Sequence, residues 1–207
     1  MITDFSKPIL QAGPKFSSRE LRAEFARKGM HILIAMIPGL AAVDLSNTTL
    51  LLMGGILFYT WAESMRFLGF TLPIISSVTA SVLRKREQNR FALGPVTLGL
   101  GALLSLLIFP PSVAAAAIYA LAFGDSAAGL VGRFLGRFRP AFLAGKSLEG
   151  SLACFAAAFV AGFLVFREWK IAAALALGAM LADALPITDF DNLLLPLTAG
   201  LCALVFL

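Results

Sequence analysis

Residues 91–109 read FALGPVTLGLGALLSLLIF and residues 111–123 read PSVAAAAIYALAF, with a proline pair at 110–111 where the two stretches meet. Neither stretch contains a charged residue. A helix that crosses the hydrocarbon core of a bilayer needs about 20 mainly apolar residues, and a proline pair marks a turn between helices. The two stretches therefore predict a pair of membrane helices joined by a tight turn.

Similar apolar stretches lie on both sides of this pair. Hydrophobic residues make up 59% of the 207 residues and charged residues 14%, whereas about 25% of the residues of a soluble domain are charged. The remaining stretches are 31–43, 48–62, 150–166, 171–185 and 193–207. Together they predict an all-α polytopic membrane protein with about seven transmembrane helices. Several stretches are short for a full span, so we expect flanking residues to extend them, the first helix beginning near Ser18.

Residues 67–83 form a segment of a different kind. Hydroxyl side chains such as Thr71 and Ser76 interleave with Leu72 and Ile75 at helical spacing. Such an amphipathic stripe suits a helix that lies in the membrane interface. We therefore predict one interfacial helix here, in addition to the seven spans.

The basic residues favour a cytoplasmic N-terminus. Six of the 17 basic residues precede Gly29, and three more form Arg84-Lys85-Arg86. Loops rich in Lys and Arg usually face the cytoplasm. We expect residues 1–17 to be a cytoplasmic tail and residues 18–207 to be a single transmembrane domain. The net charge of +5 does not gather on a long soluble element, so we expect no nucleic-acid partner.

With this orientation, nearly every charged residue faces the cytoplasm. The segments concerned are 18–30, 63–90, 124–149 and 186–192. Any polar chemistry should therefore take place at the cytoplasmic face of the membrane.

Two charged groups lie at the ends of the first two spans. Glu24, Arg27, Lys28 and His31 follow the spacing of one helix face. They are either a positive membrane anchor or a phosphate-binding stripe. His31 mildly favours the stripe, because burying an imidazole at the edge of an apolar span costs free energy unless it has a polar partner. Glu63 and Arg66, three residues apart, form either a local ion pair or part of a site.

The segment 124–137 combines an acid with small residues and two arginines. In a helix, Asp125, Gly129, Gly132 and Gly136 share one face, with Arg133 and Arg137 beside them. Small residues at this spacing are typical of close helix packing. A nucleotide–magnesium site also fits, because the carboxylate can hold a hard cation and the arginines can neutralise phosphate.

A second phosphate-like motif follows at 145–151, which reads GKSLEGS. Gly145-Lys146-Ser147 resembles the end of a P-loop, but Pro140 stands where that motif needs a glycine, and no strand precedes it. A soluble P-loop fold is therefore excluded. Ser147 with Gly150 also fits a helix start, which accounts for Ser147 but not for Lys146.

The last polar group precedes the final apolar stretch. Asp183 lies near the end of one predicted span, and Asp191 and Asn192 lie at the start of the next. One of the latter two can cap the last helix. Asp191 can equally be a second metal ligand.

Taken together, these motifs resemble the family of CTP-dependent lipid kinases that includes dolichol kinase, phytol kinase and eukaryotic-type diacylglycerol kinase. The matching blocks are Arg27-Lys28-x-x-His31, Glu63-x-x-Arg66, Gly124-Asp125-x-x-Ala128 with Gly132 and Gly136, Gly145-Lys146-Ser147-x-Glu149-Gly150-Ser151, and Asp191-Asn192 with Pro196. The resemblance covers residues 24–196. Such proteins often carry Glu at the position of Asp183.

The resemblance implies that 18–207 is a catalytic domain that transfers a phosphoryl group from CTP, with Mg²⁺, to the hydroxyl of a lipid alcohol such as diacylglycerol, a polyprenol or phytol. The catalytic candidates are Asp125, Lys146, His31 and Glu63, with His31, Glu63 or Asp183 accepting the proton. The nucleotide and phosphate candidates are Arg27, Lys28, Gly129, Gly132, Arg133, Gly145, Lys146, Ser147 and Glu149. The metal candidates are Asp125, Glu149 and Asp191, and the further polar candidates are Arg66, Asp183 and Asn192.

Two other functions stay open at this point. Residues 124–151 also resemble phosphatidate cytidylyltransferase, although its longer C-terminal acidic and His-Gly signature is missing. A non-enzymatic lipid or ion transporter would use intramembrane charges to line a pathway, but we see no sequence repeat of the kind common in transporters. The expected partners are the bilayer, a nucleotide and a lipid alcohol. A homo-oligomer is possible.

Overall fold

The computed structural model describes residues 18–70, 91–140, 143, 145–185, 187 and 190–207, and within these ranges the regular structure is helical, without strands. This confirms the all-α prediction for the described residues. The helices are α1 (Ser18–Ile34), α2 (Ile37–Val43), α3 (Leu45–Phe67), α5 (Gly94–Ile108), α6 (Pro111–Tyr119), the π-helix η2 (Ala120–Gly124), α7 (Asp125–Phe134), α8 (Leu148–Phe166), α9 (Trp169–Ala184) and α10 (Asp191–Leu204).

In the described part of the chain, three helical stretches are long and apolar enough to cross a membrane: Glu24–Val43, Pro111–Phe134 and Leu148–Phe166. Gly94–Ile108 and Asp191–Leu204 are apolar but shorter. Several apolar helices thus suggest a membrane protein, while the number of seven spans stays a prediction. The predicted interfacial helix and the Arg84-Lys85-Arg86 cluster fall on residues that lie outside the described ranges.

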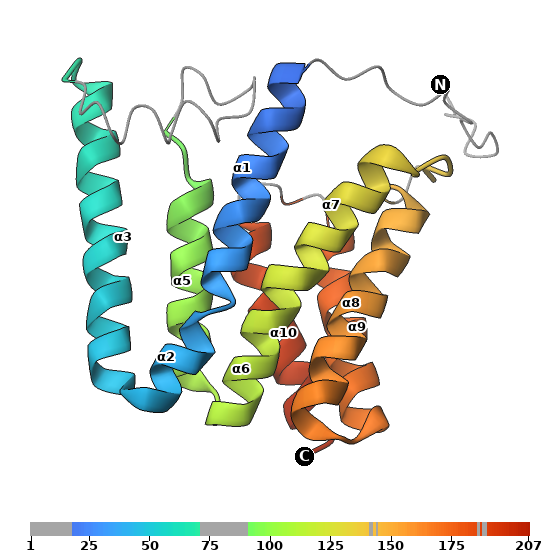
Figure 1. Ribbon diagram of the computed structural model, residues 1–207. Coiled ribbons are helices and arrows are strands. Elements are labelled where there is room, and N and C mark those ends of the chain that lie inside the picture. The colour runs from blue at the N-terminus through green and yellow to red at the C-terminus, as the bar shows by residue number, and fades with distance from the viewer. Residues whose placement is uncertain (1–17, 71–90, 141–142, 144, 186, 188–189) are drawn as a thin grey trace, which may run out of the picture.

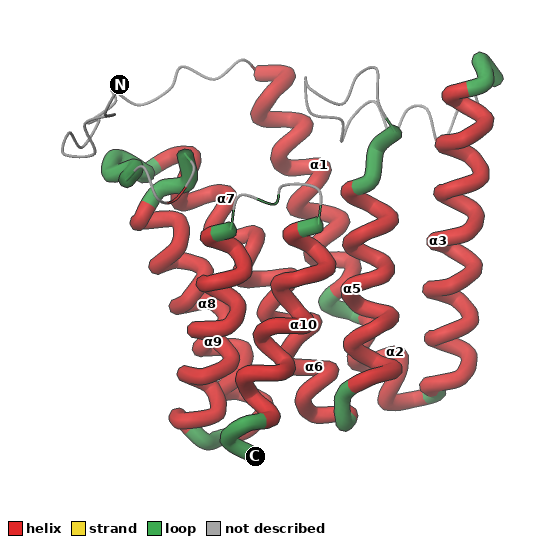
Figure 2. The backbone as a smooth tube through the Cα atoms, turned by 180° about the vertical axis from the view of Figure 1, so that it is seen from behind, coloured by secondary structure: helices red, strands yellow, loops and turns green. Residues whose placement is uncertain are grey.

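The helices form a bundle in which α3 lies at one edge and α8 and α9 at the other (Figure 1). α1 begins at one end of this bundle, and the chain ends at the other. Seen from behind, α10 lies between α5 and the α8–α9 pair (Figure 2). The end at which α1 begins also holds the end of α7 and the starts of α8 and α10. Segments from across the sequence therefore meet at this end.

The predicted turns have clear local causes. Asp44 separates α2 from α3, and its carboxylate accepts the N–H of Asn47 at 2.9 Å, which caps α3. Pro111 occupies the first position of α6, where its missing N–H costs nothing. The first helix begins at Ser18, as predicted.

The core is built largely from small residues. Ala116, Ala117 and Ala120 of the central α6–η2 segment are completely buried. A Cβ on Gly124 would lie 3.2 Å from Cys154 Sγ of α8. Small side chains of this kind allow close approach of helices in membranes, where packing drives association.

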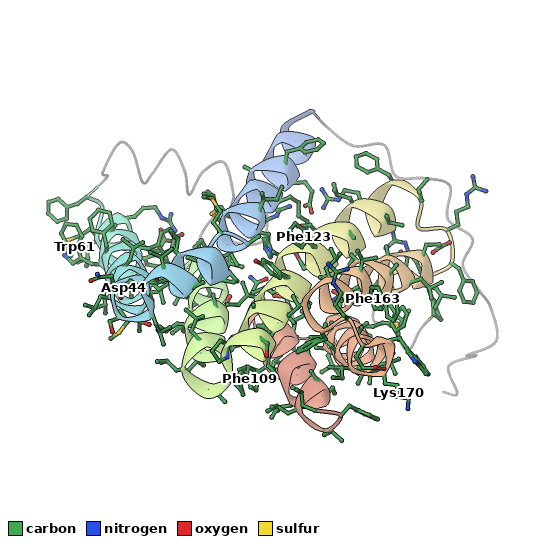
Figure 3. All side chains as sticks on the ribbon, turned by 60° about the horizontal axis from the view of Figure 1, so that its bottom comes forward. Asp44, Trp61, Phe109, Phe123, Phe163 and Lys170 are labelled. Atoms are coloured by element: carbon green, nitrogen blue, oxygen red, sulfur yellow. The ribbon has the colours of Figure 1, made fainter. Side chains whose placement is uncertain are left out.

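The outer surface is apolar. Trp61 and Phe163, labelled in Figure 3, are 51% and 39% exposed, and Val43 is 88% exposed. Extended exposed apolar surface is unusual for a soluble monomer. A lipid environment accounts for it.

Candidate functional site

A polar pocket of about 390 Å³ lies where α1, α7, α9 and the starts of α8 and α10 meet. The predicted site residues that line it are Lys28, Asp125, Gly129, Gly132, Arg133, Gly145, Lys146, Ser147, Asp183 and Asp191. The fold thus brings together four of the sequence motifs, which lie as far apart as α1 and α10.

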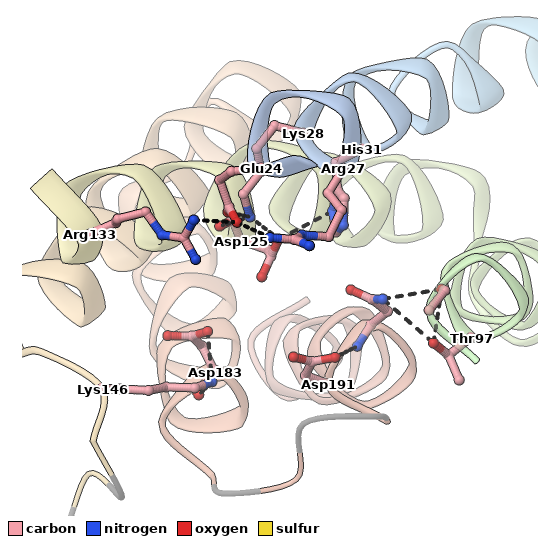
Figure 4. Close-up of polar contacts among 12 residues, drawn as sticks. Glu24, Arg27, Lys28, His31, Thr97, Asp125, Arg133, Lys146, Asp183 and Asp191 are labelled. Carbon is pink, nitrogen blue, oxygen red and sulfur yellow. Dashed lines mark hydrogen bonds and ion pairs between the residues drawn. The ribbon is translucent and has the colours of Figure 1, made fainter. Parts of the chain in front are cut away.

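Asp125 is the first residue of α7 and directly follows the π-helix η2. Its Oδ2 lies 2.6 Å from the Nζ of Lys28, which also donates to the Asp125 main-chain carbonyl at 2.8 Å. His31 Nδ1 lies 3.4 Å from the same Oδ2 and makes no hydrogen bond to a described residue. The carboxylate of α7 is therefore held against the charged face of α1 (Figure 4).

The charged stripe on α1 faces the interior of the protein. Glu24, Lys28 and His31 are each less than 9% exposed. Glu24 pairs with Arg27 and lies 3.3 Å from Arg133 Nη1 of α7. This burial argues against a surface anchor, because an anchor for anionic headgroups has to be exposed, and a phosphate-binding role of the stripe stays a prediction.

The glycines of α7 serve close packing. A Cβ on Gly129 would lie 2.7 Å from Lys28 Nζ, and one on Gly132 would lie 3.0 Å from Ser147 Oγ. Gly136, two residues beyond the end of α7, is packed in the same way, since a Cβ there would come within 2.5 Å of the same Ser147 Oγ. Packing therefore explains these glycines, and it also lets Lys28 and Ser147 approach the pocket. Phosphate contacts by Gly129 and Gly132 stay a prediction.

The segment 145–149 separates into residues with different tasks. Gly145 takes a positive φ of 90°, a conformation that suits glycine. Ser147 caps α8, since its Oγ accepts the Gly150 N–H at 3.1 Å, so the predicted helix start is confirmed. Lys146 is not used by the cap. It donates to the main-chain carbonyl of Asp183, and its Nζ lies 3.1 Å from Asp183 Oδ1.

Glu149, a predicted metal and phosphate residue, does not line the pocket. Its Oε1 accepts the backbone N–H groups of Arg137 and Phe138 at 2.9 and 3.0 Å. Its carboxylate thus holds the chain that follows α7.

Glu63 and Arg66 lie apart from the pocket. Glu63 is completely buried, accepts two hydrogen bonds from Arg66 and accepts the Ala92 N–H at 2.9 Å. Hydrogen bonding to Glu63 raises the pKa of the Arg66 guanidinium, which lies beyond the apolar stretch 48–62. Because α3 lies at the opposite edge of the bundle from α8 (Figure 1), the structure favours the local ion pair over a catalytic Glu63.

Three further predicted residues do not line the pocket either. Asn192 Nδ2 donates to the Gly94 carbonyl at 3.3 Å and so connects α10 to α5. Arg27 pairs with Glu24, and His31 lies against Asp125, so both contact residues that line the pocket.

Arg139 is a pocket residue that sequence reasoning left out. It belongs to no motif, and its neighbours Phe138 and Pro140 give no periodic signal. Its contacts are to main-chain carbonyls, which a side-chain pattern does not encode.

No protein-family model matches the chain, and no solved structure matches it. A comparison with curated proteins finds 28% identity over 119 residues with CTP-dependent diacylglycerol kinase 1 of Schizosaccharomyces pombe (strain 972 / ATCC 24843). The chain is similar to a CTP-dependent lipid kinase. The match covers 57% of this chain and 49% of the relative, so the chain matches about half of the relative's length. The similarity supports the CTP-dependent lipid kinase family without selecting a member.

The carboxylates of the pocket are the residues that could hold a cation. Among the described residues, no group of three or more His, Cys, Asp or Glu could hold a metal by itself. Asp125 and Asp191 nevertheless line the same pocket. Mg²⁺ is commonly bound by one or two carboxylates together with substrate phosphates and water. These two oxygen donors therefore suit a metal that arrives with a nucleotide.

Proposed function

We propose that this protein is a membrane lipid kinase that transfers the terminal phosphoryl group of CTP to the hydroxyl of a lipid alcohol. One observation carries the proposal. Lys28, Asp125, Arg133, Lys146 and Asp191, drawn from four separate motifs, line one pocket in a bundle whose outer surface is apolar. The similarity to a CTP-dependent diacylglycerol kinase supports the same reaction.

The charges of the pocket match what phosphoryl transfer requires. The reaction needs positioning and neutralisation of phosphate charge more than covalent chemistry from the protein. Lys28 and Lys146 place ammonium groups on opposite sides of the pocket, and Arg133 adds a guanidinium (Figure 4). Arginine suits phosphate because its planar fork can make paired hydrogen bonds.

Asp125 and Asp191 would hold Mg²⁺, which supplies positive charge to the phosphates when bound. In the structure, Lys28 neutralises Asp125 at 2.6 Å. Lys28 lies in the same pocket as this carboxylate, so its ammonium group would be available to phosphates bound there. The ion pair thus compensates a partly buried acid when no nucleotide is bound.

Among the three candidate proton acceptors, the geometry favours Asp183. Asp183 lines the pocket, whereas His31 does not line it and lies against Asp125, and Glu63 is enclosed by Arg66 and Ala92. A base must come within hydrogen-bonding reach of the hydroxyl, which requires access to the pocket.

The lipid part of the proposal is supported by a second, apolar groove of about 920 Å³. It is lined by Tyr119, Phe123 and a face of α8 that includes Ala153, Ala157 and Leu164. Phe123 precedes Asp125 by two residues, a rise of about 3 Å along a helix. A hydrocarbon chain in this groove would therefore end near the depth of Asp125. The positive-inside rule leads us to propose that this end of the bundle faces the cytoplasm.

The test is incubation of the purified protein with CTP labelled at the γ-phosphate, Mg²⁺ and a panel of diacylglycerol, polyprenol and phytol. We expect label in one lipid product and release of CDP. Release of pyrophosphate with phosphatidate as substrate would identify a cytidylyltransferase instead. Absence of any transfer, with CTP failing to stabilise the protein, would refute an enzyme of this class.

A further inference from the structure

Arg139 connects the end of α7 to the loop that carries Lys146. Its Nη1 donates to the Gly145 carbonyl at 2.6 Å, and its Nη2 donates to the Gly132 carbonyl at 2.9 Å. Gly145 directly precedes Lys146, and Gly132 lies within the last four residues of α7. Carbonyls in that last turn lack helical partners, so the guanidinium provides one.

Both bonds depend on the shape of the side chain. A guanidinium presents N–H donors in a fixed plane, so it can reach two carbonyls at once. A lysine ammonium carries the same charge as a single point and cannot reproduce this fork. The contact should therefore be sensitive to replacement of arginine by lysine.

A second connection reinforces the first. The carboxylate of Glu149 accepts the backbone N–H groups of Arg137 and Phe138, and the Leu148 N–H donates to the Phe138 carbonyl at 3.0 Å. Residues 137–139 and 145–149 are thereby held together on the end of α7. Lys146 leaves this unit pointing at Asp183 across the pocket.

We infer that Arg139 is a positioning residue for the nucleotide, an inference that rests on the proposed function. Its two hydrogen bonds to main-chain carbonyls hold the loop so that Lys146 faces the phosphate site. The role is exerted through Lys146 and not on the lipid. Loss of the two bonds should weaken CTP binding and leave the response to the lipid alcohol unchanged.

The experiment uses the full chain in lipid nanodiscs and three variants: Arg139→Lys, Arg139→Met and Arg137→Met. Arg137 is the matched control, because its side chain is exposed and does not line the pocket, and its bond to Glu149 comes from the backbone. Amide hydrogen exchange over residues 145–149 is measured without nucleotide. We measure two further quantities in parallel. One is the CTP concentration that gives half-maximal thermal stabilisation in the presence of Mg²⁺, and the other is the KM for the lipid alcohol.

We expect exchange in this segment to quicken by at least about tenfold in both Arg139 variants, as for the loss of a charge-assisted hydrogen bond. Half-maximal stabilisation should need at least about fivefold more CTP, and the KM for the lipid should stay within about twofold. Arg137→Met should resemble the unmodified protein in all three measurements.

Normal exchange and CTP response in Arg139→Lys would show that charge alone matters and would overturn the inference. Equal effects of Arg137→Met and Arg139→Met would do the same. If the unmodified protein itself did not respond to CTP, the proposed function would fail. In that case, faster exchange in the Arg139 variants would show that Arg139 holds the loop without a role in nucleotide binding. The inference would then be refuted together with the proposed function.

Discussion

Replacement of Asp125 by Asn separates the chemical role of this residue from its packing role. The change keeps size and hydrogen-bonding reach but removes the charge that faces Lys28 at 2.6 Å. Lys28 would keep its bond to the Asp125 main-chain carbonyl at 2.8 Å and its pairing with Glu24 at 3.8 Å. Because both survive, we expect the free energy of unfolding to fall by only about 1–2 kcal/mol.

The effect on activity should be larger. A metal bound with the nucleotide would lose one of its two anionic protein ligands, so we expect phosphoryl transfer to fall by at least about 100-fold. That loss corresponds to about 2.7 kcal/mol in the barrier. Transfer is measured at saturating CTP and lipid, after thermal unfolding has shown that the variant is folded at the assay temperature.

The matched control is Asp44→Asn. Asp44 caps α3 at the other end of the bundle and does not line the pocket. It should lose stability through its cap, by about 1 kcal/mol, with transfer within about twofold of normal. Near-normal transfer by a folded Asp125→Asn protein would refute the metal role and assign Asp125 to the ion pair with α1 alone.

Three further substitutions test the site. Lys146→Met should leave thermal stability without nucleotide nearly unchanged, abolish stabilisation by CTP and lower phosphoryl transfer at least about tenfold. If CTP stabilised this variant as much as the unmodified protein, the nucleotide would not bind at this loop. Glu63→Gln should lower the free energy of unfolding by about 3 kcal/mol and leave kcat within about twofold of normal. If kcat fell by more than the loss of folded protein explains, Glu63 would have a catalytic role. Ala157→Phe should raise the KM for the lipid alcohol several-fold by filling the apolar groove. The control is Ala42→Phe, at an exposed position of α2, and equal KM values for the two variants would exclude the groove as the lipid site.

Much of the fold could be predicted because its signals are local. The apolar stretches, the proline pair at 110–111 and the start at Ser18 each depend on a few adjacent residues. The spacing of the α1 stripe also placed its four polar residues on one face of the helix. Its partner could not be predicted, because Lys28 and Asp125 are separated by 97 positions.

The remainder of the site depends on main-chain groups. Arg139 binds two carbonyls and Glu149 binds two N–H groups, and backbone donors and acceptors occur at almost every position, so they leave no mark in a side-chain pattern. Glu63 shows the opposite difficulty. Its spacing to Arg66 fitted both an ion pair and a catalytic acid, and only the position of α3 in the bundle distinguishes the two.

The π-helix η2 gives the α6–α7 rod a property that composition does not reveal. A π-turn holds one residue more than an α-turn, and each residue of an α-helix rotates the next by about 100°. The direction of Asp125 around the rod thus depends on how many residues precede it, in addition to the packing of the completely buried Ala120, Leu121 and Ala122. Substitutions in Ala120–Gly124 are restricted by this packing, since a Cβ on Gly124 would already lie 3.2 Å from Cys154 Sγ. A single-codon insertion or deletion there would turn the carboxylate away from α1 while leaving hydrophobicity almost unchanged.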